Sequence, residues 1–357
     1  MKKIVNYLVL VALLLTLLPV SLAGCSAAQP VKEVPVQKTE VPIQKAVIRL
    51  SQGLPEKHYI SYQFKEWADL AMKKSNGSIE VQIFPSAQLY KDADVYGAIM
   101  TGAIESGLLY SYLDANYVPE AGIWTAWYIF NTTQEICDVG YTSPLRAKID
   151  AEMEKKGIKQ LAWIPWHVED FGFVTNKPVK VPDDMKGLTI RATGPEDVAW
   201  LQKWGANPSY LSGAELYMGL QRSVIQGALA TVATSVERKL YEVAPYIVLM
   251  PMSTQNCPIG INKSFFDKLA PEQQKALVDA AKEVEAKGKA AALKDLDEIM
   301  KRAQELGVKI YKPTAEELKL WQAGKAEMRQ QVYKDKPQIL EAINQIETQL
   351  AAYRQKK

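Results

Sequence analysis

The sequence predicts an α/β protein with two lobes, and three observations lead to that prediction. Short stretches that alternate apolar and polar residues, such as 46–50 and 78–84, are separated by longer stretches with helical spacing. About 310 of the 357 residues follow residue 45, enough for two lobes of about 150 residues each. From Pro271 the composition shifts to Ala, Lys, Glu and Leu, which predicts long helices towards the C-terminus.

The N-terminus has the pattern of a secretory signal. Two lysines, Lys2 and Lys3, precede an apolar run that ends near Leu18, and Leu-Ala-Gly leads to Cys25. The run is too short to predict a permanent membrane span. The four residues ending in Cys25 resemble a bacterial lipobox, which implies that residues 1–24 are removed and that Cys25 is acylated and held at the membrane. The alternative is an ordinary signal peptide with an incidental cysteine.

Residues 25–45 are predicted to be the lipidated cysteine and a flexible tether, because they are rich in Pro, Gln, Lys and Glu and hold no aromatic residue. We therefore expect an extracytoplasmic, lipid-anchored protein. Loss of Lys2 and Lys3 with the leader lowers the formal charge from +3 to +1, so no nucleic-acid partner is expected. Cys137 and Cys257 could form a disulfide or remain free thiols.

The first half of the folded region alternates strands with helices. A strand at 46–50 leads to a helix whose apolar side carries Phe64 and Trp67, and Pro85 ends the next strand, 78–84. A helix at 92–102 and a strand at 106–110 follow. This alternation favours α/β architecture over a helical bundle.

The second half continues in the same way. The predicted elements are a helix ending at Lys156 with Gly157 as its C-cap, strands at 159–163, 173–176 and 188–192, and helices at 198–204, capped by Gly205, and at 215–224. Two long helices are expected, one to about Leu306 and one from Thr314 to the end, with a strand at 308–311 between them.

Arg191 is the leading candidate for a ligand-binding residue. It lies in a strand pattern in which Leu188, Ile190 and Ala192 alternate with polar residues, so its side chain is directed away from the apolar face. A guanidinium held on a strand suits bidentate binding of a carboxylate. The alternative is a solvated arginine or half of an ordinary ion pair.

Four segments together resemble the solute-binding proteins of TRAP transporters, the DctP-type family. They are Asn76–Leu89, Met185–Arg191, Gly205–Pro208 with the Glu-x-Tyr of 215–217, and Ile261–Leu269. The resemblance implies a two-lobed periplasmic-binding-protein-like fold with a central cleft and a long helix that touches both lobes. It implies lobe I at 46–168 plus about 257–296, and lobe II at 169–256 plus about 297–357.

The resemblance also implies a function. Such a protein binds a small organic acid in the cleft and delivers it to separate membrane permease subunits driven by an ion gradient, with no cofactor. Arg191 matches the arginine that pairs with the ligand's carboxylate. Closure of the lobes would remove water and strengthen that pair.

Other positions depart from the family pattern. Phe171 stands where many members have a second arginine, Ala230 where an asparagine is expected, and Gly213 where an aromatic or polar residue is frequent. These replacements predict a ligand with one carboxylate and apolar or aromatic bulk. The alternative is a misaligned loop.

Further ligand-contact candidates are aromatic and hydroxyl side chains near the expected cleft. We expect contacts from Trp127, Tyr217, Thr231 and Ser111, and Tyr112 beside Ser111 could also face the cleft. The family resemblance places five aromatic residues near the cleft, and one or two of them are expected to reach a ligand: Trp124, Trp127, Tyr128, Trp163 and Trp166. Most of the remaining tryptophans are expected to be core residues.

Enzymatic activity is not expected. His58 and His167 are the only histidines and have no zinc-binding spacing, and no nucleophile elbow or phosphate loop is present, so we assign no catalytic residue, metal site or cofactor. Two other functions remain open, a sugar-binding or other solute-binding protein of an ABC-type importer and, with less in its favour, a secreted enzyme.

Overall fold

The computed structural model describes residues 43–252 and 255–356. The predicted leader, Cys25 and the tether up to residue 42 lie outside the described residues. Within the described part of the chain, no helix combines the length and the apolar character needed to cross a membrane.

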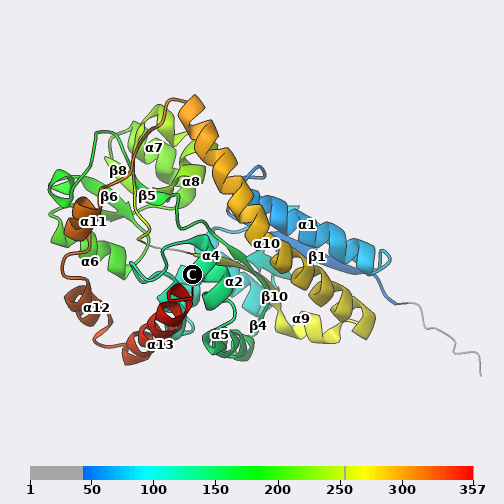
Figure 1. The fold of residues 1–357 in the computed structure, drawn as a ribbon. Helices are drawn as coiled ribbons and strands as arrows, with labels where there is room; N and C mark the ends of the chain where they lie inside the picture. The colour runs from blue at the N-terminus through cyan, green and yellow to red at the C-terminus, as the bar shows by residue number, and fades with distance from the viewer. Residues whose placement is uncertain (1–42, 253–254, 357) are drawn as a thin grey trace, which may run out of the picture. The chain divides into compact units, whose positions relative to one another are not determined.

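Two mixed β-sheets form the centres of two lobes (Figure 1). The first sheet contains β1 (Ala46–Ser51), β2 (Ile79–Phe84), β3 (Ser106–Leu108), β4 (Ile158–Pro165) and β10 (Asn256–Asn262), in the order β2-β1-β3-β10-β4. The second contains β5 (Phe171–Thr175), β6 (Thr189–Ala192), β7 (Asn207–Tyr210), β8 (Gly227–Thr231), β9 (Tyr246–Leu249) and β11 (Lys309–Tyr311), in the order β11-β9-β5-β8-β6-β7.

Each sheet contains one strand that runs against its neighbours. In the first sheet β10 is antiparallel to β3 and β4, and in the second β5 is antiparallel to β8 and β9. The chain passes from the first sheet to the second between β4 and β5 and returns between β9 and β10. Two crossing segments therefore join the sheets, residues 166–170 and the stretch whose described residues are 250–252 and 255, and the chain enters the second sheet again at β11.

Helices surround both sheets. In the first half of the chain they are α1 (Tyr59–Lys74), α2 (Asp92–Thr101), α3 (Ser111–Asp114), α4 (Thr133–Glu135), α5 (Pro144–Lys155), α6 (Pro195–Lys203) and α7 (Leu216–Gln221). In the second half they are α8 (Val232–Glu237), α9 (Lys263–Lys268), α10 (Pro271–Glu305), α11 (Ala315–Trp321), α12 (Lys325–Tyr333) and α13 (Pro337–Arg354). Short 3₁₀ or π turns occupy Pro119–Trp124, Ile136–Gly140, Pro182–Met185, Gly213–Glu215 and Leu240–Glu242.

Both predicted glycine caps are confirmed. Gly157 follows α5 with a φ of 91°, and Gly205 follows α6 with a φ of 73°. Glycine adopts this left-handed conformation without the steric cost that other residues incur, so each helix ends where the sequence places the glycine.

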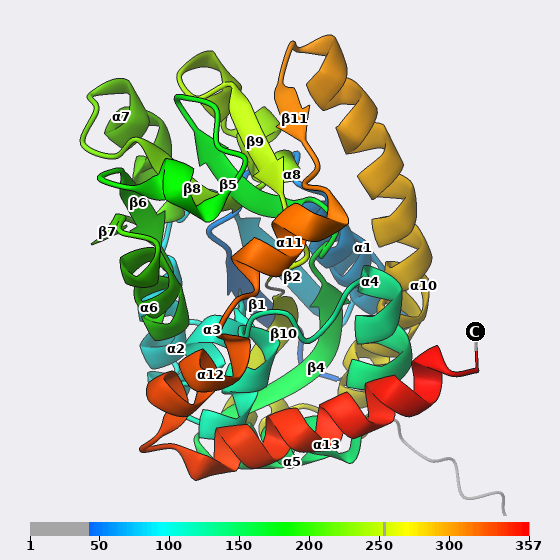
Figure 2. The same cartoon turned by 60° about the vertical axis from the view of Figure 1, so that its left-hand side comes forward.

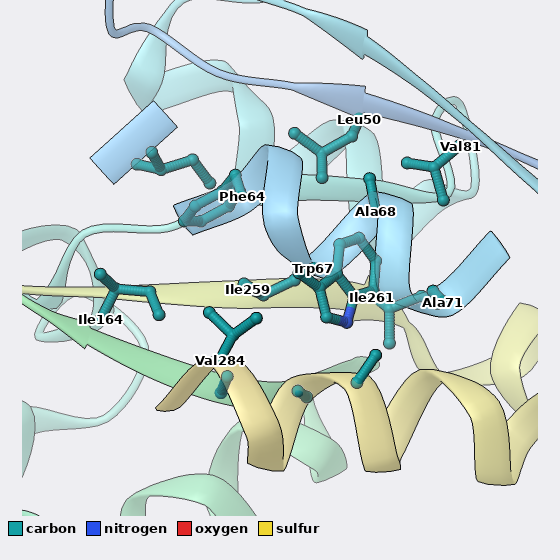
Figure 3. Packing of buried hydrophobic residues seen from close by; sticks show 14 of the residues in the cluster. Leu50, Phe64, Trp67, Ala68, Ala71, Val81, Ile164, Ile259, Ile261 and Val284 are labelled. Atoms are coloured by element: carbon teal, nitrogen blue, oxygen red, sulfur yellow. The ribbon is translucent and has the colours of Figure 1, made fainter. Parts of the chain in front are cut away.

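One face of the first sheet is covered by α1 and α10 (Figure 3). Leu50, Val81 and Ile259 contribute apolar side chains from the sheet. Trp67 of α1 is fully buried, and its indole nitrogen donates a 3.3 Å hydrogen bond to the carbonyl of Leu277 in α10. The two helices therefore pack as one layer on the sheet.

The opposite face of this sheet carries α2, α5 and the last helix, α13. Ile343 and Ile346 of α13 are buried in the same cluster as Trp124 and Trp163. This differs from the assignment of the whole of 297–357 to lobe II, because the last helix returns to lobe I. An amphipathic pattern predicts that a helix buries one face, but not which sheet it packs against.

The long helix α10 contacts both lobes, as the family resemblance implies (Figure 2). Val284 belongs to the core beside α1, whereas Ile299 and Ala303 belong to the second-lobe core with β9 and α8. One rigid element thus contributes to both hydrophobic cores.

Other differences from the predictions are local. The predicted helix from Thr314 onwards is three helices, with Gly324 at a φ of 78° and Pro337 separating them. Strands β7 to β10 were not predicted. The residues of β8 and β10 are all buried, so these strands lack the alternation that marks a half-exposed strand.

Candidate ligand-binding site

A cavity that opens partly to solvent lies between the two lobes. The first lobe contributes Leu54, Asp92, Tyr110 and Tyr112, and the two crossing segments contribute Trp166 and Gln255. The second lobe contributes the rest of the wall, including Phe171, Arg191, Thr193, Gly213, Ala230, Thr231, Thr234 and Arg238. A ligand in this cavity would contact both lobes at once.

Arg191 lies in the wall of this cavity, on β6. Ile190 and Ala192 on either side of it are buried in the second-lobe core, so the strand's alternation directs the guanidinium to the other face. Its Nε donates to the carbonyl of Leu211 at 3.0 Å, and Nη1 donates to the carbonyl of Leu229 at 3.2 Å. The side chain is therefore held in one orientation before a ligand arrives.

The charge of Arg191 has no direct partner in the described part of the chain. No carboxylate there lies within 4.0 Å of it, and Nη2 makes no hydrogen bond with the described residues. Burial lowers the pKa of Arg191, and the nearby Arg238 adds to that effect, although arginine stays protonated at any physiological pH. A half-buried, oriented guanidinium without a carboxylate partner is suited to bind an anion.

Four of the other predicted site residues also line the cavity: Phe171, Gly213, Ala230 and Thr231. Phe171 and Thr231 face each other across the β5–β8 pair. The Thr231 hydroxyl caps α8 by accepting from the Thr234 amide at 3.0 Å, and a second 3.0 Å bond joins the two threonine hydroxyls. Of the further candidates, Tyr112 and Trp166 lie in the same wall, whereas Trp124, Tyr128 and Trp163 are buried outside its lining.

The structure places three predicted residues away from this wall. Trp127 is fully buried in the second-lobe core, where it stacks on Trp200 with ring centroids 5.6 Å apart. Tyr217 donates to Glu242 at 2.9 Å on the outer surface. The Ser111 hydroxyl is buried and accepts from the Asn256 amide at 3.0 Å. Sequence spacing placed these residues near the cleft but could not give the direction of their side chains.

Two charged residues of the cavity were not predicted, Asp92 and Arg238. Asp92 is the first residue of α2, and Arg238 directly follows α8. Neither belongs to a short motif with a recognisable spacing. The sequence shows only that Asp92 starts a predicted helix, and an aspartate at a helix N-terminus is equally typical of a residue that stabilises the helix.

The wall also contains buried polar atoms without partners. Oδ1 of Asp92 and the indole nitrogen of Trp166 make no hydrogen bond within residues 43–252 and 255–356. Buried polar atoms in proteins are almost always satisfied, so these two are candidates to bind polar groups of a ligand.

The described residues offer no group of three or more His, Cys, Asp or Glu side chains that could hold a metal ion. The two cysteines in the described part, Cys137 and Cys257, are free thiols. Burial raises the pKa of Cys137 to about 12, which makes its thiolate rare at neutral pH. The choice between a disulfide and free thiols is thus decided in favour of free thiols.

Two α/β lobes, two crossing segments and an interlobe cavity with an unpaired arginine define a two-lobed solute-binding protein. The chain belongs to the bacterial extracellular solute-binding protein family 7, the DctP family, whose model matches residues 50–336. The resemblance to TRAP solute-binding proteins is confirmed.

Relatives with assigned ligands are similar over most of the chain. The 2,3-diketo-L-gulonate-binding periplasmic protein YiaO of Escherichia coli K12 is 28% identical over 69% of this chain and 75% of its own. The C4-dicarboxylate-binding periplasmic protein DctP of Rhodobacter capsulatus is 26% identical over 72% and 77%. A TRAP periplasmic solute-binding protein from Haemophilus influenzae, solved with bound L-gulonate, is 25% identical, has a TM-score of 0.79, and is matched over 85% of this chain and 99% of its own.

Proposed function

We propose that this protein is the extracytoplasmic receptor of a TRAP transporter and binds a small organic acid in the interlobe cavity. The observation that carries this proposal is Arg191, a half-buried guanidinium in the cavity wall that is fixed by two carbonyls and has no carboxylate partner in the described chain. Two relatives are named for binding 2,3-diketo-L-gulonate and C4 dicarboxylates, and these names support an acid as the ligand.

The chemistry of the cavity modifies the expected ligand. Phe171 and Ala230 support the predicted monocarboxylate with apolar or aromatic bulk. However, Thr193, Thr231 and Gln255 lie in the same wall, together with the two charged residues that the sequence analysis did not predict. A wall of this polarity suits an acid that also carries hydroxyl groups, because hydroxyls can hydrogen-bond to polar groups that an apolar ligand would only remove from water.

The test is ligand binding by the wild-type protein and by Arg191→Ala. A thermal-shift screen of monocarboxylates, hydroxy acids and dicarboxylates should find ligands that stabilise the wild type, by about 2.7 kcal/mol at a hundredfold excess over Kd. Arg191→Ala should bind the best of them at least about tenfold more weakly in calorimetry, since a charge-assisted hydrogen bond is lost.

The exposed Arg222 provides the matched control, because Arg222→Ala removes the same charge from the surface. Equal affinity of wild type and Arg191→Ala would contradict the proposed site. Stabilisation by neutral sugars alone would favour the ABC-type alternative.

In this proposal the loaded receptor docks on ion-gradient-driven permease subunits and is tethered to the membrane through acylated Cys25. The lipobox-like sequence before Cys25 supports the anchor. Cys25→Ala should release the protein from the membrane fraction of expressing cells, and continued membrane association of that variant would contradict the anchor. Solute capture rather than catalysis is the proposed role.

A further inference from the structure

Asp92 occupies an unusual position in the cavity wall. Its carboxylate lies against the loop that follows β1. A β-carbon added at Gly53 of that loop would be 1.8 Å from Oδ1 of Asp92. The glycine therefore allows the carboxylate to lie against the loop, where Oδ1 is buried without a hydrogen-bond partner among the described residues. Burial raises the pKa of Asp92, and Arg238 and Arg191 oppose that rise. The two arginines thus favour the ionised form of Asp92.

Arg238 reaches the same place from the other lobe. Its Nη2 donates to the carbonyl of Gly53 at 3.3 Å, so the guanidinium lies beside the loop that Asp92 contacts. No carboxylate of the described chain lies within 4.0 Å of it. Asp92 and Arg238, which carry opposite charges, therefore both lie beside Gly53 but do not form a direct ion pair.

Gly213 leaves the space that Arg238 uses. A β-carbon at Gly213 would lie 3.3 Å from Nη2 and 3.5 Å from Cζ of Arg238, so any side chain there would press on the guanidinium. The sequence analysis noted Gly213 as a lost polar group. In the structure the absence of a side chain at Gly213 makes room for the guanidinium of Arg238. Arg238 thus supplies a positive charge in place of the arginine that many family members have at the position of Phe171.

Among the residues that line the cavity, positive charges outnumber negative charges by one, and Asp197, outside the lining, also interacts with Arg191 and raises its pKa. Arg191 and Arg238 contribute two positive charges and Asp92 one negative charge. Burial raises the pKa of Tyr110 and Tyr112, so both are neutral, and burial raises the pKa of the neighbouring Glu237 to about 9. A monoanion would balance the charges of the lining residues, whereas a dianion would place a second negative charge in the same wall as Asp92.

We propose that Asp92 and Arg238 form a specificity pair that selects monocarboxylates bearing hydroxyl groups, with the carboxylate on Arg191 and a hydroxyl between Asp92 and Arg238. A hydroxyl suits this place because it donates to a carboxylate and accepts from a guanidinium at the same time. A second carboxylate would be repelled by Asp92, and an alkyl chain would leave Oδ1 of Asp92 without a hydrogen-bond donor. This inference rests on the proposed function and names its ligand class.

The test uses three six-carbon acids that differ in one feature each: D-gluconate, hexanoate without hydroxyls, and D-glucarate with a second carboxylate. Calorimetry on the purified wild-type protein should show gluconate binding at least about tenfold more tightly than either of the other two. In Asp92→Asn the ratio of the Kd for glucarate to the Kd for gluconate should fall by about tenfold or more, because the variant no longer repels the second carboxylate of glucarate. The exposed Asp94→Asn, in the same helical turn, is the control and should change nothing.

Two further variants test Arg238. Arg238→Met and Gly213→Ala should each weaken gluconate binding by about tenfold and leave hexanoate unchanged within about twofold. Gly213→Ala keeps the arginine and only displaces it, which separates its role in recognition from a loss of folding. Arg222→Met is the surface control.

The results can refute the specificity pair without refuting the proposed function. If Arg191→Ala loses gluconate but the Asp92, Arg238 and Gly213 variants keep the wild-type order of the three acids, the specificity pair is refuted and the proposed function stands. A wild-type preference for hexanoate or glucarate would refute the pair in the same way. Binding of none of the three acids would refute the pair, and the proposed function would then be decided by the wider thermal-shift screen.

Discussion

Nε2 of His58 and Oε2 of Glu237 lie 3.5 Å apart in the interior behind the ligand cavity, and this pair is a contact between neutral groups. His58 Nδ1 accepts from the Ile60 amide at 3.2 Å, which places the proton of the neutral ring on Nε2. Burial lowers the pKa of His58 well below its usual value, with Arg238 adding to the effect, and burial raises the pKa of Glu237 to about 9. Neither group is charged at neutral pH, so the contact is not an ion pair.

This protonation state predicts how stability depends on pH. Between about pH 4.5 and about pH 9 the folded protein keeps the Glu237 proton that the unfolded chain releases, so the free energy of unfolding should fall as the pH rises. Glu237→Gln, which is always neutral, should lose that contribution to the pH dependence. At pH 9 the variant should be more stable than the wild type by at least about 1 kcal/mol, measured by urea denaturation at pH 5, 7 and 9.

The exposed Glu305→Gln is the control and should leave the profile unchanged. A wild-type protein whose stability rises from pH 5 to pH 9, with Glu237→Gln no different, would show that Glu237 is ionised in the folded state.

Trp127 is predicted to act on stability and not on ligand affinity. Its indole nitrogen donates to Asp197 at 2.9 Å inside the second-lobe core. Trp127→Phe removes that donor and some packing, so it should lower the free energy of unfolding by about 2–4 kcal/mol. The Kd of the best acid found in the screen should stay within about twofold. Tyr217→Phe, on the surface, should change neither quantity, and a large rise in Kd for Trp127→Phe would return Trp127 to the binding site.

The last helix is predicted to stabilise the first lobe. Ile346 of α13 is fully buried in the cluster around Trp124 and Trp163. Ile346→Ala should cost about 2–5 kcal/mol of stability, because a cavity is left in that core. The exposed Asn344→Ala, on the same helix, should have an effect of less than about 0.5 kcal/mol. Similar melting curves for the two variants would contradict the packing of α13 on this lobe.

Much of the fold was predictable because its signals are local. Alternation around Arg191, the glycines after α5 and α6 and the change of composition at Pro271 are each read within a few residues, and the structure agrees with all of them. The strands β8 and β10 escaped prediction because burial on both faces removes the alternation. The direction of the Trp127 side chain could not be predicted, because an aromatic residue near a cleft can equally well belong to the core.

Local pattern therefore predicted the α/β class, the family and the direction of Arg191 away from the apolar face of its strand, since a strand's alternation and a motif's order are properties of neighbouring residues. Only the tertiary structure brought Asp92 and Arg238 to one cavity. They come from helices of different lobes and meet at the carbonyl and the missing side chain of Gly53. Charge complementarity between residues nearly 150 positions apart depends on how the lobes pack, and no spacing in the sequence encodes that contact.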